Sequence, residues 1–197
     1  MIKSKDELIR FIKADQKALG IQAKKKRNLF QCLIFPSGIS EFQANLRKLE
    51  YIEGRPQSLI IRIWKFIVYR RYLQLSHLLS FSIPPNVFGP GLSIAHRGTI
   101  VVNKGARVGA NCRLHVCVNI GTEAGQSHVA PKIGNNVYIG PGAKIYGDIE
   151  IADGCAIGAN AVVNKSFLEP GSVIAGVPAK KVGEVDTGRL LIKGAEM

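Results

Sequence analysis

Cysteine is scarce in this sequence, and the marks of a secreted protein are missing with it. The 197 residues contain four cysteines, Cys32, Cys112, Cys117 and Cys155, which is too few for a disulfide framework. The chain also opens without the charged segment, apolar run and small-residue cleavage site of a secretory signal. We therefore expect a protein of the reducing cytoplasm.

Long hydrophobic runs are missing as well. The longest stretch without Lys, Arg, Asp or Glu covers residues 72–96 and is interrupted by Pro84, Pro85 and Pro90. Only about a dozen residues precede the first proline, whereas a membrane-spanning helix needs ~20. A membrane span is therefore not expected. Apolar residues still make up 46% of the chain, which excludes wholesale disorder.

Acidic residues are few, and the charge is unevenly distributed. The chain has 27 Lys and Arg against 14 Asp and Glu, and residues 1–80 hold 16 of the basic and 6 of the acidic side chains. Only 3 of the 21 glycines lie in that part. These shifts predict a basic α-helical region at residues 1–81, a glycine-rich β domain at 82–183 and a tail at 184–197.

The basic region attracts anionic partners in general. No nucleic-acid fold signature accompanies the charge, so we expect no nucleic acid partner. Peripheral association with a membrane stays open. In the basic region, the apolar residues of the third expected helix, residues 57–79, cover more than one helical stripe. This pattern predicts a helix that is buried on several sides. The basic side chains interleaved there favour a protein partner or a membrane surface over a helix that crosses lipid.

Helix boundaries in the basic region have local signals. Ser4 with Glu7 predicts a capping box at the start of the first helix. Ser40 with Gln43 predicts a second one, and Pro56 fits the first position of a third helix. Glycines 20 and 54 fit the ends of the first two helices.

The second part of the chain contains an internal repeat of six residues. Small or apolar residues stand four places after each repeated aliphatic residue, and glycine often stands directly after it. The aliphatic positions are Val102, Val108, Leu114 and Ile120, followed after a break by Ile133, Ile139, Ile145, Ile151, Ile157 and Val163. A period of six matches neither an α-helix nor a simple strand. It predicts short strands joined by tight turns, with three units per 18-residue coil and coils stacked as parallel strands.

The repeat segments resemble those of the hexapeptide-repeat acyltransferases. The matching segments are residues 108–113, 133–149 and 157–163, and the closing signature of that family is similar to residues 175–182. The resemblance covers residues 82–183. It implies a mainly β fold, a left-handed parallel β-helix preceded by the α-helical region. It also implies acetyl-CoA as co-substrate and a homotrimer with active sites between subunits.

Within that family the chain looks most like the serine acetyltransferase branch, which includes enzymes that acetylate capsule or other surface sugars. Residues 96–102 and 131–147 carry this resemblance. Acetyl transfer to a hydroxyl needs a general base and a donor for the oxyanion, and histidine titrates near neutrality. The resemblance places the base on His96.

Two further histidines compete for a role. The step from Ile120 to Ile133 is 13 residues where two repeats would take 12, so we expect a loop at residues 125–132. His128 lies in that loop, where related sugar acetyltransferases carry their base, and it is the alternative catalytic residue. His115 follows an inward position and is expected to face outward on a flat side.

Two residues depart from the serine acetyltransferase pattern. The acid before the catalytic histidine is Ala95 here, and the second orienting acid falls at Phe81. Glu123 or a backbone carbonyl remains to orient the His96 ring. Because these acids help to hold serine or the imidazole in that branch, their loss favours a saccharide hydroxyl as acceptor. L-Serine stays as the alternative.

The resemblance also assigns a coenzyme A groove, recognised mainly through backbone. The assigned residues are Gly121, Gly140, Gly142, Ala143, Gly158, Ala161, Pro178, Lys180 and Lys181, with the two lysines suited to the cofactor phosphates. Cys112 and Cys155 occupy repeat corners and are expected to serve packing. The sequence shows no phosphate-binding loop and no metal-ligand pattern.

Readings outside acetyl transfer also remain. One is a non-catalytic hexapeptide-repeat assembly or binding protein. Another is a metal-dependent hydratase using His96, His115 and His128, whose spacing does not fit that type. Whether a trimer doubles through the N-terminal helices is not encoded in any motif.

Overall fold

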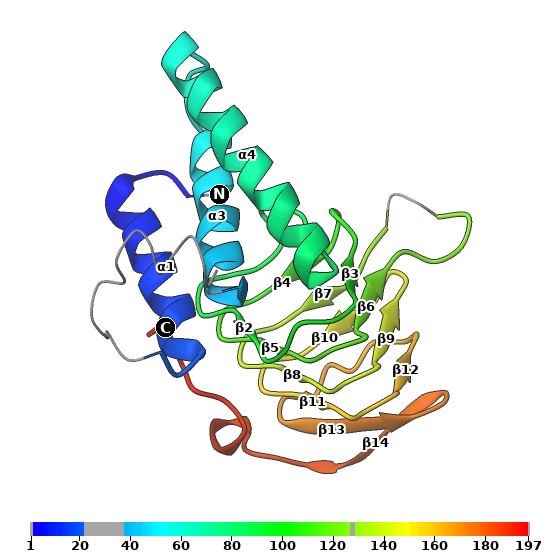
Figure 1. Cartoon of the computed structure of the whole chain (residues 1–197). Helices are drawn as coiled ribbons and strands as arrows, with labels where there is room; N and C mark the ends of the chain where they lie inside the picture. Colours follow the sequence, from blue (N-terminus) through cyan, green and yellow to red (C-terminus); the bar gives the residue numbers. More distant parts are fainter. Residues whose placement is uncertain (1, 22–37, 127–128, 197) are drawn as a thin grey trace.

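A computed structural model describes residues 2–21, 38–126 and 129–196. In these ranges the helices come first: α1 (Lys5–Ala18), α3 (Gly38–Glu53) and α4 (Leu59–Leu79). A stack of short strands follows, and the α3–α4 pair stands on one end of that stack (Figure 1). No helix in the described ranges is long and apolar enough to cross a membrane.

The first capping prediction is confirmed. The Ser4 hydroxyl accepts a hydrogen bond from the Glu7 backbone N–H at 3.0 Å, and the Glu7 carboxylate accepts one from the Lys3 N–H at 2.8 Å. Helix α1 then ends at Ala18, and Gly20 follows with φ of 70°. This is a left-handed conformation that glycine adopts without strain.

The next two helix starts differ from the predictions. Helix α3 begins at Gly38, so Ser40 lies inside it, and the Gln43 side chain donates to the Leu92 carbonyl at 2.5 Å. The amide therefore serves a tertiary contact instead of a cap. Helix α4 is capped by the Ser58 hydroxyl, which accepts from the Ile61 N–H at 3.4 Å. Pro56 consequently lies before the helix.

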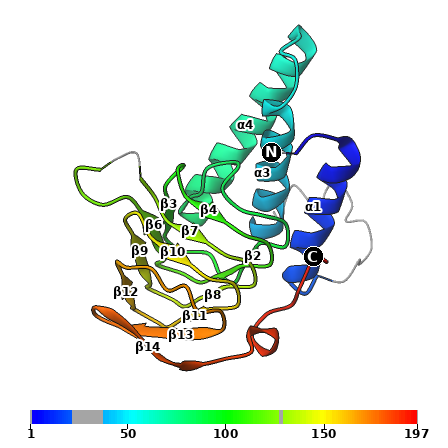
Figure 2. The same ribbon diagram turned by 180° about the vertical axis from the view of Figure 1, so that it is seen from behind.

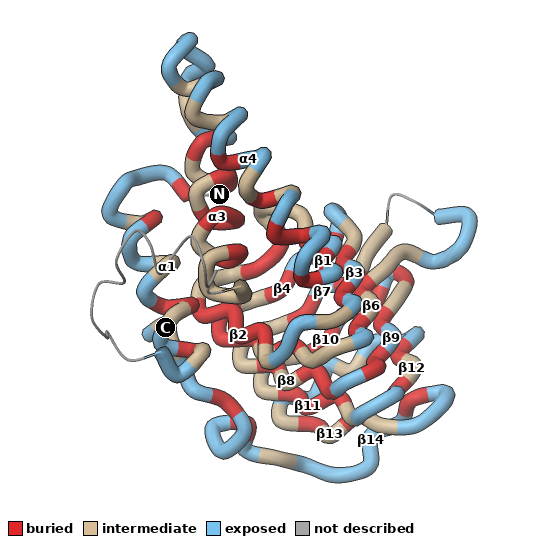
Figure 3. Tube along the Cα trace, in the orientation of Figure 1, coloured by how far each residue is buried: buried red, intermediate tan, exposed pale blue. Residues whose placement is uncertain are grey.

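Helix α4 is buried on one face only, which corrects the prediction of burial on several sides. Val68, Tyr72, Leu75 and Leu79 are buried against α3 and the start of the coil. The opposite face stays exposed along the first turns, at the end that extends beyond the strands (Figure 3). A broad apolar helix surface here reflects an unpaired face and not a deeper core.

The strands wind through three parallel sheets, as the six-residue period predicts. The first sheet holds β1 (Phe81–Ser82), β3 (Ile100–Val102), β6 (Asn119–Gly121), β9 (Lys144–Tyr146) and β12 (Val162–Val163). The second holds β4 (Arg107–Val108), β7 (Lys132–Ile133) and β10 (Glu150–Ile151). The third holds β2 (Ser93–Ile94), β5 (Arg113–Leu114), β8 (Tyr138–Ile139), β11 (Ala156–Ile157), β13 (Ser172–Gly176) and β14 (Ala179–Glu184). Only β14 runs antiparallel to its neighbour.

All ten repeated aliphatic residues are buried inside the coil. Most corner residues are buried too, but Ala124 is exposed and Phe167 is partly exposed. Ala124 departs because the chain leaves the coil after Gly121 and re-enters at Lys132. The excursion thus begins three residues earlier than predicted and ends at residue 131. His128 lies outside the described residues.

Polar side chains at one corner form hydrogen bonds between successive coils. The Asn135 Oδ1 atom accepts from the Ala110 N–H at 2.8 Å, and the Asp153 Oδ1 atom accepts from the Asn135 N–H at 2.7 Å. Asn111, Asn136 and Asn160 have φ near 56°, a left-handed conformation that asparagine tolerates better than most residues. Each turn therefore satisfies its exposed amides from the next coil.

A buried charge cluster joins the helices to the coil. Arg47 of α3 is fully buried, with its Nε 2.8 Å from Asp15 of α1 and its Nη1 3.0 Å from Glu50. It also donates to the Phe88 and Gly89 carbonyls at 2.8 and 2.7 Å. Although burial alone would lower the pKa of Arg47, Asp15 and Glu50 together raise it above its usual range. The Arg47 guanidinium is thus held as a cation, while burial raises the pKa of its partner Asp15 against the opposing charge of Arg47.

The C-terminal segment returns along the coil to α1 (Figure 2). A 3-10 helix, η1 (Thr187–Arg189), follows β14. The Asn111 Oδ1 atom then accepts from the N–H groups of Gly194 and Ala195 at 3.0 and 2.8 Å. The first helix, one coil turn and the end of the chain are therefore packed together.

Candidate active site

His96 lies in a bend of the coil, two residues after the end of β2, and is exposed. The register places β2, β5 and β8 side by side, with Ile94 beside Leu114 and Leu114 beside Ile139. The His96 and His115 ring centroids are 6.2 Å apart, and His115 lies 5.1 Å from the Tyr138 ring. Three successive coils thus bring two imidazoles and a phenol together on the outer surface.

Arg113 contacts His115 and contributes to lowering its pKa. Its Nε donates to His115 Nε2 at 3.5 Å, and because guanidinium nitrogens only donate, that ring nitrogen must carry a lone pair. Burial lowers the pKa of His115, and the charges of Arg113 and His96 lower it further. Burial and both charges thus favour the neutral imidazole of His115. The sequence did not indicate the contact of Arg113 with His115, nor the position of His115 beside the candidate base His96.

The predicted absence of family carboxylates next to His96 is visible in the surroundings. Ala95 is partly buried, and Phe81 is buried in β1 with its ring 5.2 Å from Phe42. Glu123 is exposed and accepts a weak bond from Gln126 at 3.4 Å. Among the described residues, no side-chain hydrogen bond to the His96 ring is found.

The glycines of the assigned groove are needed by the coil itself. A Cβ atom on Gly140 would lie 2.8 Å from the Ile157 carbonyl oxygen. Gly142 has φ of 77°, and a Cβ there would collide with the Asn160 side chain. Gly121 and Gly158 lie at the ends of β6 and β11. Close stacking therefore explains these glycines without a ligand, while leaving backbone groups near the surface.

The remaining groove residues divide into buried and exposed members. Ala143 and Ala161 are fully buried, so a cofactor can meet only their backbone. Pro178 is exposed in the turn between β13 and β14, and Lys180 is exposed on β14. The side chain of Lys181 pairs with Glu169 and Glu184, and these hydrogen bonds raise its pKa. Lys180 is thus the freer of the two lysines.

The corner cysteines are packing residues, as predicted. Cys112 and Cys155 are buried, and burial raises the pKa of the Cys112 thiol to about 12. A thiol with such a pKa is inert as a nucleophile at neutral pH. Among the described residues there is no group of three or more His, Cys, Asp or Glu side chains that could hold a metal ion.

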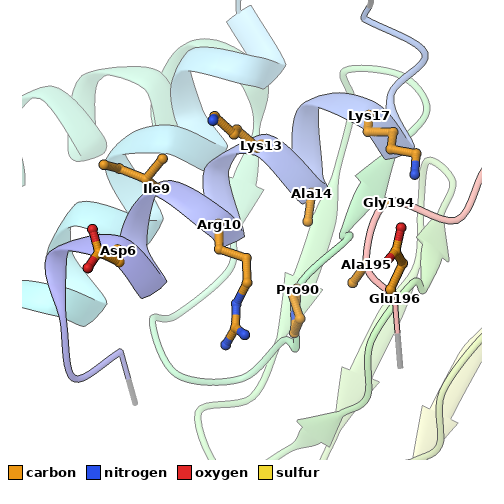
Figure 4. Close-up of a pocket in the computed structure, with 10 residues that line it drawn as sticks. All are labelled: Asp6, Ile9, Arg10, Lys13, Ala14, Lys17, Pro90, Gly194, Ala195 and Glu196. Carbon is orange, nitrogen blue, oxygen red and sulfur yellow. The ribbon is translucent and has the colours of Figure 1, made fainter.

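A cavity of about 710 Å³ lies between α1 and the C-terminal segment, away from His96. It is lined by Asp6, Ile9, Arg10, Lys13, Ala14, Lys17, Pro90, Gly194, Ala195 and Glu196. Figure 4 shows these side chains along one side of α1, with Lys17 near Glu196. The lining mixes both charge signs and brings no nucleophile beside a base. It therefore offers no catalytic arrangement.

Sequence comparisons connect the chain to known transferases. The family described as "Bacterial transferase hexapeptide (six repeats)" matches residues 130–165. The serine acetyltransferase of Mycobacterium tuberculosis is 36% identical over 104 residues, which cover 51% of this chain and 44% of the relative. That of Escherichia coli K12 is 35% identical over 124 residues, covering 60% and 44%. The chain thus spans less than half the length of these relatives.

Solved structures extend the similarity through the helices. The crystal structure of serine acetyltransferase from Brucella abortus has a TM-score of 0.69 and 26% identity, covering 91% of this chain and 70% of that chain. A structure of that enzyme in complex with coenzyme A gives the same TM-score and identity, covering 91% and 69%. By its repeats, its helical region and these matches, the chain is similar to hexapeptide-repeat transferases and, among them, to serine acetyltransferases.

Proposed function

We propose that the chain is an acetyl-CoA-dependent O-acetyltransferase with His96 as general base. The observation that carries the proposal is the position of His96, an exposed residue in a bend of the coil, in a fold that matches serine acetyltransferases. A matching structure contains coenzyme A, which supports acetyl-CoA as the co-substrate here. The groove residues assigned above, Gly121 through Lys181, belong to the same proposal.

The reaction requires one proton to move twice. His96 takes the proton of the acceptor hydroxyl as its oxygen forms a bond to the thioester carbonyl carbon. Collapse of the tetrahedral intermediate breaks the carbon–sulfur bond, and the His96 proton goes to the departing thiolate. His115 lies one coil away, with its ring centroid 6.2 Å from that of His96, and is a candidate hydrogen-bond donor to the acceptor or the oxyanion.

L-Serine is the acceptor that the comparisons favour. The relatives described above carry the name serine acetyltransferase, which supports the second of the two acceptors expected from the sequence. Serine carries a carboxylate, and the Arg113 guanidinium near His96 offers a matching charge. Arg113 is thus a natural contact for that end of the substrate.

A saccharide hydroxyl is the second candidate. It is favoured by Ala95 and Phe81, the two positions near His96 where the resemblance expects carboxylates. Without them the serine ammonium lacks its expected partners. A sugar, which has no ammonium group, needs none.

The assembly and compartment are also proposed. Glycine-rich coils with exposed edges suit a homotrimer, with the groove between neighbouring subunits and His128 of the excursion as a second functional histidine. A dimer of trimers would add a contact through the helices. The cysteine usage suits the cytoplasm.

Thiol release from acetyl-CoA tests the proposal. We expect turnover of the full chain with L-serine, and a smaller or absent rate with sugars and nucleotide sugars. His96→Ala should lower kcat by ~10²–10⁴-fold and leave acetyl-CoA binding intact. His77→Ala is the matched control, since His77 is exposed on α4.

Each other outcome has a definite meaning. Turnover with sugars alone would replace serine by the saccharide reading. Normal turnover by His96→Ala would move the base to His128. Absence of both turnover and acetyl-CoA binding would reject the enzyme in favour of a non-catalytic repeat protein.

A further inference from the structure

The first turns of α4 expose an unusual amount of apolar surface. Leu59, Ile60, Ile63, Phe66 and Ile67, here named the α4 patch, are exposed by 73%, 78%, 54%, 63% and 60%. They share the helix face opposite the one that packs on α3. Single exposed apolar residues are ordinary, but a contiguous set of this size marks an interaction surface.

The charged side chains of α4 itself have one sign. Helix α4 contains Arg62, Lys65, Arg70 and Arg71 and no acidic residue. Arg71 pairs with Glu41 of α3 at 2.7 Å. Arg70 lies over the Phe66 ring at 6.0 Å from its centroid. Cations therefore border the apolar side chains directly.

A cavity opens beside the same helix turns. It has a volume of about 520 Å³ and is lined by Leu49, Glu53, Gln57, Arg62, Lys65, Phe66, Tyr69, Tyr72 and Pro85. Its one acid, Glu53, accepts a hydrogen bond from the Asn86 side chain at 2.8 Å. Arg62, Lys65 and the patch residue Phe66 thus line the same cavity.

We propose that the α4 patch docks on an anionic lipid bilayer surface. Its apolar side chains would enter the boundary between headgroups and acyl chains, while Arg62, Lys65 and Arg70 meet the lipid phosphates. This is the arrangement of an interfacial helix, with an apolar face and basic flanks. The patch lies at the end of α4 that extends beyond the coil (Figures 1 and 3), so a flat surface reaches it unobstructed.

A second copy of the chain fits the patch less well. Two α4 helices packed through these faces would bring together six basic side chains, Arg62, Lys65 and Arg70 of each copy, and no acid of the helix itself. Like charges at close range oppose such a contact. An anionic surface neutralises the same charges, and α4 is not apolar enough to cross the bilayer.

Vesicle flotation with the full chain tests this docking. We expect binding to phosphatidylcholine vesicles that contain phosphatidylglycerol, weak binding to phosphatidylcholine alone, and weaker binding at high salt. Ile60→Ser with Phe66→Ser should abolish flotation. Arg62→Gln with Arg70→Gln should weaken it roughly 20-fold, at the strength usual for two cations near an anionic surface.

The control is Leu168→Ser, because Leu168 is 67% exposed in the segment between β12 and β13. It should float like the parent chain. Circular dichroism checks that the serine variants keep their helices, as expected for exposed positions. Acetyl transfer is not needed for the readout.

Two results would overturn the docking. One is absence of flotation of the parent chain with anionic vesicles, or flotation unchanged by the patch substitutions. The other is an assembly in sedimentation velocity that depends on Ile60 and Phe66 while vesicles are not bound. That result would assign the patch to a second copy.

Discussion

The helical region and the coil are stabilised in different ways. In the coil, equivalent aliphatic residues fill each layer and the same polar bonds repeat from turn to turn. The helical region shares an apolar core with the start of the coil and adds one buried charge cluster centred on Arg47, which contacts α1, α3 and the segment before β2. The repeated interior spreads stability over many equivalent sites, whereas the charge cluster places several polar contacts on one residue.

The largest effect is expected from Arg47→Ala. The change leaves Asp15 and Glu50 buried without their cation, and it strips the Phe88 and Gly89 carbonyls of a donor. Breaking a buried pair in this way costs ~3–5 kcal/mol. Denaturant unfolding followed by helix circular dichroism measures the loss.

Arg107→Ala is the control for that variant, because the exposed Arg107 guanidinium contacts only nearby carbonyls. It should change stability by no more than ~0.5 kcal/mol. Replacing Asp15, Arg47 and Glu50 together by apolar residues separates the loss of the cation from the loss of the whole cluster. Such a replacement often leaves the free energy of unfolding unchanged, so we expect the triple variant to be more stable than Arg47→Ala. If Arg47→Ala unfolds like the parent, the cluster does not hold the helices.

A smaller loss is expected from Ile139→Ala in the coil. Ile139 is fully buried between its layer neighbours Leu114 and Ile157, and removing its methyl groups costs ~2–4 kcal/mol through lost burial and a cavity. Thermal or denaturant unfolding checks the value. Val101→Ala, at an exposed position of β3, should cost far less; equal costs for both would argue against a packed coil interior.

The smallest effect is a pH dependence that belongs to one coil position. The pKa of His115 is lowered by burial, then by the charges of Arg113 and His96. Below about pH 6.5, the ordinary histidine pKa, the unfolded chain binds more protons here than the folded one. His115 therefore destabilises the fold as the pH falls from there toward its folded pKa.

His115→Phe should flatten that part of the profile. Melting temperatures recorded from about pH 7.5 down to about pH 5 provide the measurement. The parent should lose more stability than the variant over this interval. Parallel profiles for the two proteins would show that His115 is not held neutral.

The coil could be read from the sequence because its signal is local and repeated. Each layer places an aliphatic residue and a small corner residue at fixed spacing, and the exception at Ala124 follows from the excursion that the 13-residue step indicates. Arg47 could not be found this way. Its partner Asp15 is 32 residues away, and nothing in either helix pattern marks a charged residue as buried.

The sequence predicted only part of the candidate active site. His96 came from the resemblance. The 18-residue coil did not place its neighbour His115, because the register pairs Ile94 with Leu114, which are 20 residues apart. The exposure of the α4 patch was not readable, since an apolar helix surface looks the same whether it is covered or not. The patch is exposed because α3 packs against only one face of α4.

The antiparallel strand β14 has a consequence for solubility. A stack of parallel coils presents unpaired N–H and C=O groups at its last layer, and such an edge can recruit further chains into a fibre. Here β14 pairs antiparallel with β13 at the end of the third sheet and carries Lys180, Lys181 and Glu184 on that edge. At the other end α1 and α4 contact β2 and β1. The third sheet therefore has β14 at one end and α1 beside β2 at the other, and both features oppose edge-to-edge association with another chain.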